Sequence, residues 1–290
     1  MHPYVLSLIL GVVEGFTEFL PVSSTAHLRI CQSLLGIALD DGYWKMFAIV
    51  IQLGAILTLP IYFRERIAKF LATFPNGERG DRTAITHPLT LVMIAFVCTA
   101  IPAFLLTKVI GKHLESLVIM GTSLVVGGIV MWVVDALYVR GVLAGGTDHV
   151  EQMSLGQAVW IGLCQTLSAV FPGTSRSMST IAAGQLAGMS RAAALEFSFF
   201  VSIPTMVVAT CYDLFKSLRP HHGEPAAIGH LAMHAQDWVT LFIGFAVSFV
   251  VAYGVVAWFM NWVRTRGFVP FAVYRIVVGA AVLWWALGAK

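Results

Sequence analysis

The sequence GVVEGFTEFLPVSSTAHL (Gly11–Leu28) decides how the rest of the chain is interpreted. Its apolar run carries two carboxylates, Glu14 and Glu18, and is then interrupted at FLPVSST (Phe19–Thr25). Because proline removes a backbone donor and Ser and Thr favour helix N-caps, the interruption predicts the end of one helix and the start of another. A second apolar stretch is broken in the same way at VFPGTSRS (Val170–Ser177).

The composition around these breaks is that of a membrane protein. Of the 290 residues, 58% are hydrophobic and only 11% are charged, whereas an ordinary soluble domain has about 25% charged residues. This composition excludes a soluble enzyme. The formal net charge of +3 is too small to make a nucleic acid a plausible partner.

Helix length separates the segments that can cross a bilayer from those that cannot, since a crossing needs about 20 mostly apolar residues. Six segments are long enough, and we expect each to span the membrane: residues 45–63, 88–108, 117–137, 193–215, 238–262 and 269–288. The interrupted stretches, 4–37 and 155–190, have halves that are too short. We therefore predict an all-α integral membrane protein with six transmembrane helices and two re-entrant helix hairpins, whose tips face protein or a wet cavity.

The interrupted stretches also belong to an internal repeat. A shift of 151 residues aligns the following pairs: Gly11 with Gly162, Pro21 with Pro172, Ser23 with Thr174, and Ser24 with Ser175. The same shift carries the three spans after the first hairpin onto the three after the second. Because three is odd, the second copy must enter the membrane from the opposite side. We expect a single membrane domain over 1–290, built as an inverted-topology pair of repeat A (1–140) and repeat B (152–290).

Basic residues predict the orientation of this domain in the membrane. If residues 64–87 are cytoplasmic, the cytoplasmic side carries these residues: Arg64, Arg66, Lys69, Arg79, Arg82, Arg140, Arg191, Arg264 and Arg266. The other side carries fewer: Lys112, Lys216, Arg219 and Lys290. This asymmetry satisfies the positive-inside rule and places both termini outside the cytoplasm.

Ionisable side chains within a bilayer are costly and mark candidate functional sites. Glu14 and Glu18 are four residues apart on one helical face, where like charges repel. A divalent cation, Mg²⁺ or Ca²⁺, explains the pair, because both ions prefer carboxylate oxygens and bridge phosphates. Arg176, in the second break, can hold a phosphate in a bidentate manner. The alternative is a structural ion pair between Glu18 and Arg176, with Glu14 reaching the surface.

Hydroxyl side chains gather where the second half-helices begin, and there backbone N–H groups and the helix dipole favour anions. The residues concerned are Ser23, Ser24, Thr25, Thr174 and Ser175. His27, three residues after Ser24, can act as general base, general acid or nucleophile, or simply be a hydrogen-bonded histidine. These features predict a phosphate site at which the metal and hydroxyls of one tip face the guanidinium and amides of the other.

Two motifs resemble those of a known family. EGFTEFLPVSSTAH (Glu14–His27) and PGTSRS (Pro172–Ser177) are similar to the two signature motifs of the undecaprenyl-diphosphate phosphatase family, the BacA-type bacitracin-resistance membrane proteins. The resemblance continues over essentially the whole chain through QLGAIL (Gln52–Leu57), FSFFVSIP (Phe197–Pro204) and PFAVYRIVVG (Pro270–Gly279).

The resemblance implies an acid-anhydride hydrolase that releases one phosphate from the polyprenyl lipid undecaprenyl diphosphate and so recycles the lipid carrier of peptidoglycan synthesis. It implies a divalent cation, a homodimer, and a location in the bacterial inner membrane with the site open to the periplasmic or outer face. By matching position, Glu14 and Glu18 would hold metal and diphosphate. Ser24 would be nucleophile or phosphate ligand, and His27 acid/base or alternative nucleophile. Arg176 would clamp phosphate, with Ser175 and Ser177 beside it.

Some features leave alternatives open. The family usually has Gly where this chain has Ala26 and Met178, and Met178 places bulk beside Arg176. Arg275 falls within the last span and needs a carboxylate or carbonyl partner, so we expect an architectural role for it. The competing functional class is a polyprenyl-phosphate flippase or transporter, which would need the same phosphate site.

Overall fold

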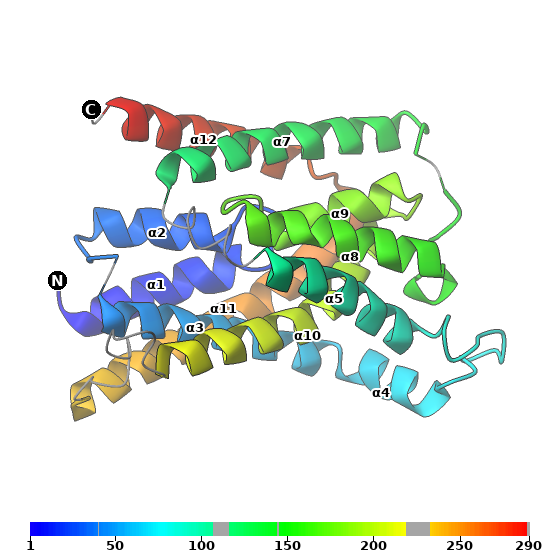
Figure 1. The fold of residues 1–290 in the computed structure, drawn as a ribbon, viewed down its shortest axis with the longest axis horizontal. Coiled ribbons are helices and arrows are strands. Elements are labelled where there is room, and N and C mark those ends of the chain that lie inside the picture. The colour runs from blue at the N-terminus through cyan, green and yellow to red at the C-terminus, as the bar shows by residue number, and fades with distance from the viewer. Residues whose placement is uncertain (40, 107–115, 144, 219–232, 289–290) are drawn as a thin grey trace. The chain divides into compact units, whose positions relative to one another are not determined.

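The protein is α-helical throughout the part of the chain that its computed structural model describes (Figure 1). The described residues are 1–39, 41–106, 116–143, 145–218 and 233–288. Six helices in these ranges are long and apolar enough to cross a membrane. They are α3 (Gly42–Tyr62), α5 (Pro88–Leu105), α7 (Leu117–Val139), α10 (Arg191–Leu218), α11 (Ala235–Thr265) and α12 (Val269–Gly288). The six predicted spans are therefore confirmed as helices of the required length.

Both interrupted stretches consist of two shorter helices, as their prolines and hydroxyl residues predict. The first contains α1 (Pro3–Thr17) and α2 (Ser24–Leu34), and the second contains α8 (Leu155–Val170) and α9 (Arg176–Leu186). Helix α8 starts with a capping box in which Ser154 and Gln157 satisfy each other's backbone N–H groups.

The link between the first two spans contains a helix that the sequence did not predict, α4 (Arg64–Thr73). A 3₁₀ turn, η1 (Val150–Gln152), precedes α8. Both elements lie in polar segments without the long apolar runs from which the other helices were inferred.

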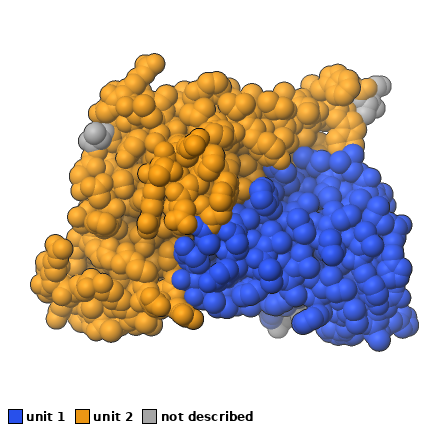
Figure 2. All heavy atoms as spheres, turned by 180° about the vertical axis from the view of Figure 1, so that it is seen from behind, with its two compact units in different colours: residues 1–19, 24–62, 202–257 blue, residues 20–23, 63–201, 258–290 orange. Residues whose placement is uncertain are grey.

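The chain forms two compact units, which Figure 2 distinguishes by colour. Unit 1 contains Met1–Phe19, Ser24–Tyr62 and Ser202–Ala257, and unit 2 contains Leu20–Ser23, Phe63–Val201 and Trp258–Lys290. Each unit takes helices from both predicted repeats. The loop between α1 and α2 belongs to unit 2, although these two helices belong to unit 1.

Glycines bring the helices of unit 1 into backbone contact. A Cβ added at Gly11 of α1 would lie 2.8 Å from the Gly244 carbonyl oxygen of α11, and one at Gly15 would lie 2.6 Å from that of Ser248. The hydroxyl of Ser248 donates a hydrogen bond to the Ile51 carbonyl of α3 (2.8 Å). Small residues at such crossings are typical of helices that pack in membranes.

Glycines also bring helices of unit 2 into backbone contact, at two helix crossings. Helix α8 meets α5 at Gly162, where an added Cβ would lie 2.4 Å from the Ala95 carbonyl oxygen. Thr99 of α5 donates a hydrogen bond to the Gly162 carbonyl (2.7 Å). Helices α7 and α12 run side by side (Figure 1), and a Cβ at Gly279 would lie 2.8 Å from the Gly121 carbonyl oxygen. The glycines of α7 therefore allow close packing against α12.

A buried carboxylate fastens one end of this helix pair. Asp135, near the end of α7, is only 1% exposed. It accepts hydrogen bonds from the Arg191 side chain at the start of α10 (2.7 Å) and from the Phe268 backbone N–H (3.0 Å), next to the start of α12. Arg191 is thus a structural residue as well as a contributor to the predicted charge asymmetry.

We expect Gly279→Ala to lower the free energy of unfolding by about 1–3 kcal/mol, because the added methyl group overpacks the crossing of α7 and α12. Gly254→Ala is the matched control, since a Cβ there has no heavy atom within 4 Å. That change is expected to be neutral or stabilising by up to about 1 kcal/mol, because alanine favours a helix. Thermal unfolding of both variants in detergent measures the difference, and equal effects would contradict the packing role.

Candidate active site

The acidic pair of the first interrupted stretch is buried in unit 1. Glu14, on α1, is 1% exposed, and Glu18, directly after α1, is 7% exposed. Neither carboxylate oxygen of Glu14 has a hydrogen-bond partner among the described residues. An unpaired buried carboxylate is expensive, which makes Glu14 a candidate functional residue.

Glu18 is paired with the first residue of α2. The hydroxyl of Ser24 donates a short hydrogen bond to Oε2 of Glu18 (2.5 Å). A hydroxyl that donates to a carboxylate is arranged as a nucleophile with its base. His27 lies one turn further along α2 and is half-buried, while Thr25 is exposed.

These donors suit a hard divalent cation. Carboxylate and hydroxyl oxygens are the ligands that Mg²⁺ and Ca²⁺ prefer, and the two unpartnered oxygens of Glu14 offer acceptors that nothing else in the described ranges uses. No group of three or more His, Cys, Asp or Glu side chains able to hold a metal occurs in those ranges. Mg²⁺ is commonly bound by one or two carboxylates together with substrate phosphates, so a pair of glutamates is a sufficient protein contribution.

The second break has a strained backbone at the start of α9. Ser175 has φ 71°, and Gly173 has φ 93°. The Ser175 hydroxyl is hydrogen-bonded to that of Ser177 (3.1 Å), and Ser177 donates to the Leu20 carbonyl (2.9 Å). Arg176 is the first residue of α9 and is half-buried. A left-handed serine is uncommon and costs about 1–3 kcal/mol, which is typical of functional turns.

Arg275 joins the two breaks within unit 2. Its side chain is fully buried on α12, and its guanidinium donates hydrogen bonds to four backbone carbonyls. The acceptors are Pro21 (3.0 Å), Ser123 (3.2 Å), Gly173 (3.1 Å) and Thr174 (2.9 Å). Pro21 comes from the first break, and Gly173 and Thr174 come from the second. The expected architectural role of Arg275 is therefore confirmed, with carbonyls as its partners.

The breaks share a local conformation but not the predicted register. Ser23, with φ 74°, immediately precedes α2, and Ser175 immediately precedes α9. The two helix starts are therefore related by a shift of 152 residues, one more than the predicted 151. The pairing of Ser23 with Thr174 was wrong at this point, and Arg176 occupies the helical position that Ser24 has in the first break.

The predicted site residues divide between the two units. Glu14, Glu18, Ser24, Thr25 and His27 belong to unit 1. The others belong to unit 2: Ser23, Thr174, Ser175, Arg176 and Ser177. Gln165, which the repeat aligns with Glu14, is also buried, so the second stretch has an uncharged side chain where the first has a carboxylate.

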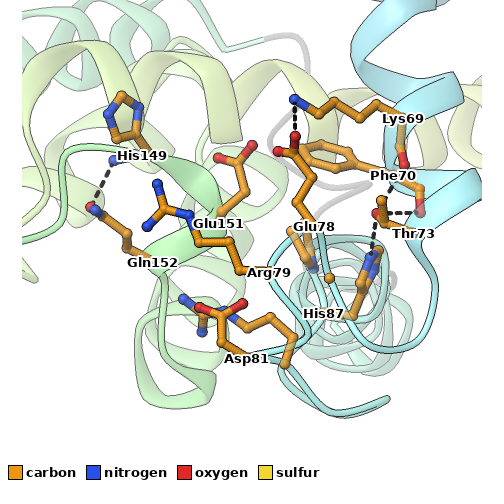
Figure 3. Close-up of a pocket in the computed structure, with 13 residues that line it drawn as sticks. Lys69, Phe70, Thr73, Glu78, Arg79, Asp81, His87, His149, Glu151 and Gln152 are labelled. Carbon is orange, nitrogen blue, oxygen red and sulfur yellow. Dashed lines mark hydrogen bonds and ion pairs between the residues drawn. The ribbon is translucent and has the colours of Figure 1, made fainter.

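A separate cavity of about 180 Å³ lies between α4 and η1 and contains none of the predicted site residues (Figure 3). Lys69 forms an ion pair with Glu78 across its wall (2.6 Å). Arg66 pairs with Glu151 (2.5 Å) and with Glu196 (2.9 Å). Burial alone would raise the pKa of Glu151, but the hydrogen bonds and charge of Arg66 outweigh it and hold that pKa below its ordinary value. The basic residues of this segment are thus partly neutralised by neighbouring carboxylates.

Comparisons with known proteins agree with the motifs at both breaks. The model of the family described as bacitracin resistance protein BacA matches residues 7–281. An undecaprenyl-diphosphatase of Koribacter versatilis is 72% identical over 287 residues, covering 99% of each chain. The undecaprenyl-diphosphatase of Sorangium cellulosum is 41% identical, covering 96% of this chain and 85% of its own. The undecaprenyl-diphosphatase of Caldanaerobacter subterraneus is 38% identical, and the match covers 98% of this chain and 96% of the relative. The chain therefore belongs to the bacitracin resistance protein BacA family.

Proposed function

We propose that this multi-pass bacterial membrane protein hydrolyses undecaprenyl diphosphate to undecaprenyl phosphate and inorganic phosphate, and so recycles the lipid carrier for cell-wall synthesis. The observation that carries the proposal is the buried Glu14 carboxylate without a partner, close in sequence to the hydrogen-bonded pair of Glu18 and Ser24. The relatives described above are all named undecaprenyl-diphosphatase, which favours hydrolysis over the transport alternative.

We propose that residues of both breaks act on the same diphosphate. The segment Leu20–Ser23 is tied to the second break through Ser177 and Arg275. Glu18 is two residues before this segment, and Ser24 directly follows it.

The residues then have complementary roles in phosphoryl transfer. We assign to Ser24, or to a water molecule, the attack on the terminal phosphorus while the bridging P–O bond breaks and undecaprenyl phosphate leaves. If Ser24 attacks, a water molecule then cleaves the bond between Ser24 and the phosphoryl group, which releases inorganic phosphate and restores the hydroxyl. Glu18 accepts the proton of Ser24, and His27 transfers a proton at the leaving or attacking oxygen. Arg176 and the amides at the start of α9 neutralise charge on the phosphoryl oxygens. A divalent cation held by Glu14 and Glu18 supplies further charge neutralisation when bound.

We also propose that the two interrupted stretches are re-entrant hairpins of an inverted repeat. In unit 1, α1 packs on α11 through Gly11, and in unit 2, α8 packs on α5 through the equivalent Gly162. The shift of 151 residues carries the contact region of α5 onto that of α11. Equivalent glycines therefore make equivalent contacts with the span of the opposite repeat, as a pseudo-two-fold arrangement requires.

The remaining features of this proposal concern placement and assembly. We infer an inner-membrane protein whose site opens to the periplasmic or outer face, with residues 64–87 in the cytoplasm. The support is the excess of Lys and Arg in that segment and on the same predicted side. A homodimer is proposed from the family resemblance alone.

A phosphate-release assay tests the function. Protein purified in detergent, where no two compartments exist, is expected to release inorganic phosphate from undecaprenyl diphosphate in the presence of Mg²⁺ or Ca²⁺. Chelation is expected to abolish release, and readdition of the metal to restore it, because the carboxylate pair then lacks the charge that attracts a diphosphate. Binding of the lipid without phosphate release would refute the hydrolase and favour transport.

A further inference from the structure

An apolar groove in unit 2 leads away from the second break. Its volume is about 420 Å³, and its walls come from α7, α8 and α9. This volume is within the range of about 300–1,000 Å³ that is typical of small-ligand sites. Representative lining residues are Val126 and Val130 of α7, Leu167 of α8, Phe171 directly after α8, and Ala182 and Leu186 of α9.

Small side chains on α9 create the hollow. Ala182 and Ala183 lie in the groove at 5% and 3% exposure, so their backbone is covered but no bulky side chain fills the space. The larger residues at the border of the groove are exposed: Val126 is 53% exposed, Leu167 50% and Leu186 44%. In a chain whose spans face lipid, such an apolar opening faces the hydrocarbon region of the bilayer.

The groove begins at the tip that is proposed to bind phosphate. Thr174 lines it, directly before the strained Ser175 and two residues before Arg176. The carbonyl of Thr174 accepts a hydrogen bond from Arg275 (2.9 Å), so the side chain that joins the two breaks also holds this end of the groove. Met178, the position where the family usually has Gly, also lines the groove, and its methyl group lies 2.8 Å from a Cβ built at Gly127.

We propose that this groove holds the first isoprenoid units of the substrate's polyprenyl chain, which enters sideways from the lipid while the diphosphate lies at the tips. The proposal rests on the proposed function and deepens it. An anionic head group and a wholly apolar, branched tail match a polar tip that continues into an apolar groove. A phospholipid acyl chain fits the apolar walls but does not explain why the groove ends at Thr174.

We expect the groove to select and orient the polyprenyl chain of the substrate, and to contribute little to the binding free energy. Lipid is as apolar as the groove, so transfer of the tail gains only van der Waals packing. Filling the groove should therefore raise KM for a long-chain substrate by about tenfold, which is the usual effect of a steric change in an apolar pocket. A diphosphate whose tail is too short to reach the filled position should not be affected.

The test compares two variants on two substrates. Ala182→Phe fills the groove from α9, and Leu163→Phe is the control on α8, where the side chain is 48% exposed and lies outside the groove. With undecaprenyl diphosphate, Ala182→Phe is expected to raise KM about tenfold with kcat nearly unchanged, and Leu163→Phe to leave both unchanged. With a five-carbon prenyl diphosphate, the two variants should behave alike. Equal kinetics of both variants on the long substrate would overturn the proposal.

Photolabelling of the unmodified full-length protein gives a second measurement that does not require a folded variant or turnover. A prenyl diphosphate with a benzophenone on its tail should label peptides of α7, α8 and α9, and undecaprenyl diphosphate, but not phosphatidylglycerol, should prevent the labelling. Labelling elsewhere, or protection by phosphatidylglycerol, would overturn the groove assignment. Specific labelling without phosphate release from any substrate would instead refute the proposed hydrolysis and leave the groove assignment standing.

Discussion

Glu18→Gln is expected to slow phosphate release at least about 10²-fold, which is the usual cost of removing a group that stabilises charge in an enzyme site. The amide keeps the size of the side chain and can still accept the hydrogen bond from Ser24. It cannot take up the serine proton, and it is a far weaker ligand for a hard cation. The loss should appear mainly in kcat, since the change acts on proton transfer and on charge that develops during the reaction.

Glu65→Gln is the matched control for this experiment, because Glu65 lies on α4 with a side chain that is 90% exposed. Both variants lose one carboxylate without a change in volume, so only a catalytic role separates them. Rates should be measured over a range of Mg²⁺ concentrations, because a lost metal ligand raises the concentration needed for half-maximal activity. A near-normal rate for Glu18→Gln at all metal concentrations would remove Glu18 from the proposed site.

Arg275→Met is expected to reduce kcat at least about 10²-fold, although this side chain is not proposed to touch the substrate. Methionine fills a similar volume but leaves four carbonyls without their donor. Each buried unsatisfied group costs about 1–3 kcal/mol, so we expect the two breaks to separate or to rearrange. Misplacement of reacting groups by about 1 Å is enough for a 10²-fold loss of rate.

Two comparisons separate positioning by Arg275 from simple loss of stability. Gly279→Ala strains the same helix one turn further along and should lower thermal stability while preserving kcat at temperatures where the protein is folded. Arg275→Lys keeps the charge with fewer, differently directed donors and should recover part of kcat. If kcat fell equally in Gly279→Ala and Arg275→Met at matched stability, Arg275 would have no specific positioning role.

The membrane spans and the two breaks could be predicted because their signals are local. A run of about 20 apolar residues needs no information from the rest of the chain, and a Pro followed by Ser and Thr acts on its own backbone. Helix α4 was not predicted because its sequence contains several basic residues and no long apolar run, so it lacks this local signal. Its Arg66 is stabilised by Glu151 and Glu196, which lie 85 and 130 residues away in the sequence.

The chemical type of the side chains was enough to predict the candidate site residues from the sequence, but not their hydrogen-bond partners. Burial of a carboxylate or guanidinium in an apolar stretch costs free energy, so such a residue is a candidate functional residue. This argument identified Glu14, Glu18 and Arg176. The hydrogen bond from Ser24 to Glu18 depends on how the chain turns between α1 and α2, and the acceptors of Arg275 are carbonyls, which every residue has. The register of the helix starts was mispredicted by one residue because a constant shift assumes that corresponding segments of the two repeats have the same length.

The long sequence separation between Pro21 and its donor, 254 residues, has a consequence for biosynthesis. Arg275 is on α12, so the ribosome synthesises it after all the other described helices. A polypeptide without α12 carries both signature motifs and the hydrogen bond from Ser177 to Leu20, but it lacks the guanidinium that holds Pro21, Gly173 and Thr174 together. The protein should therefore become active only after α12 has been synthesised, and removal of α12 alone should abolish activity.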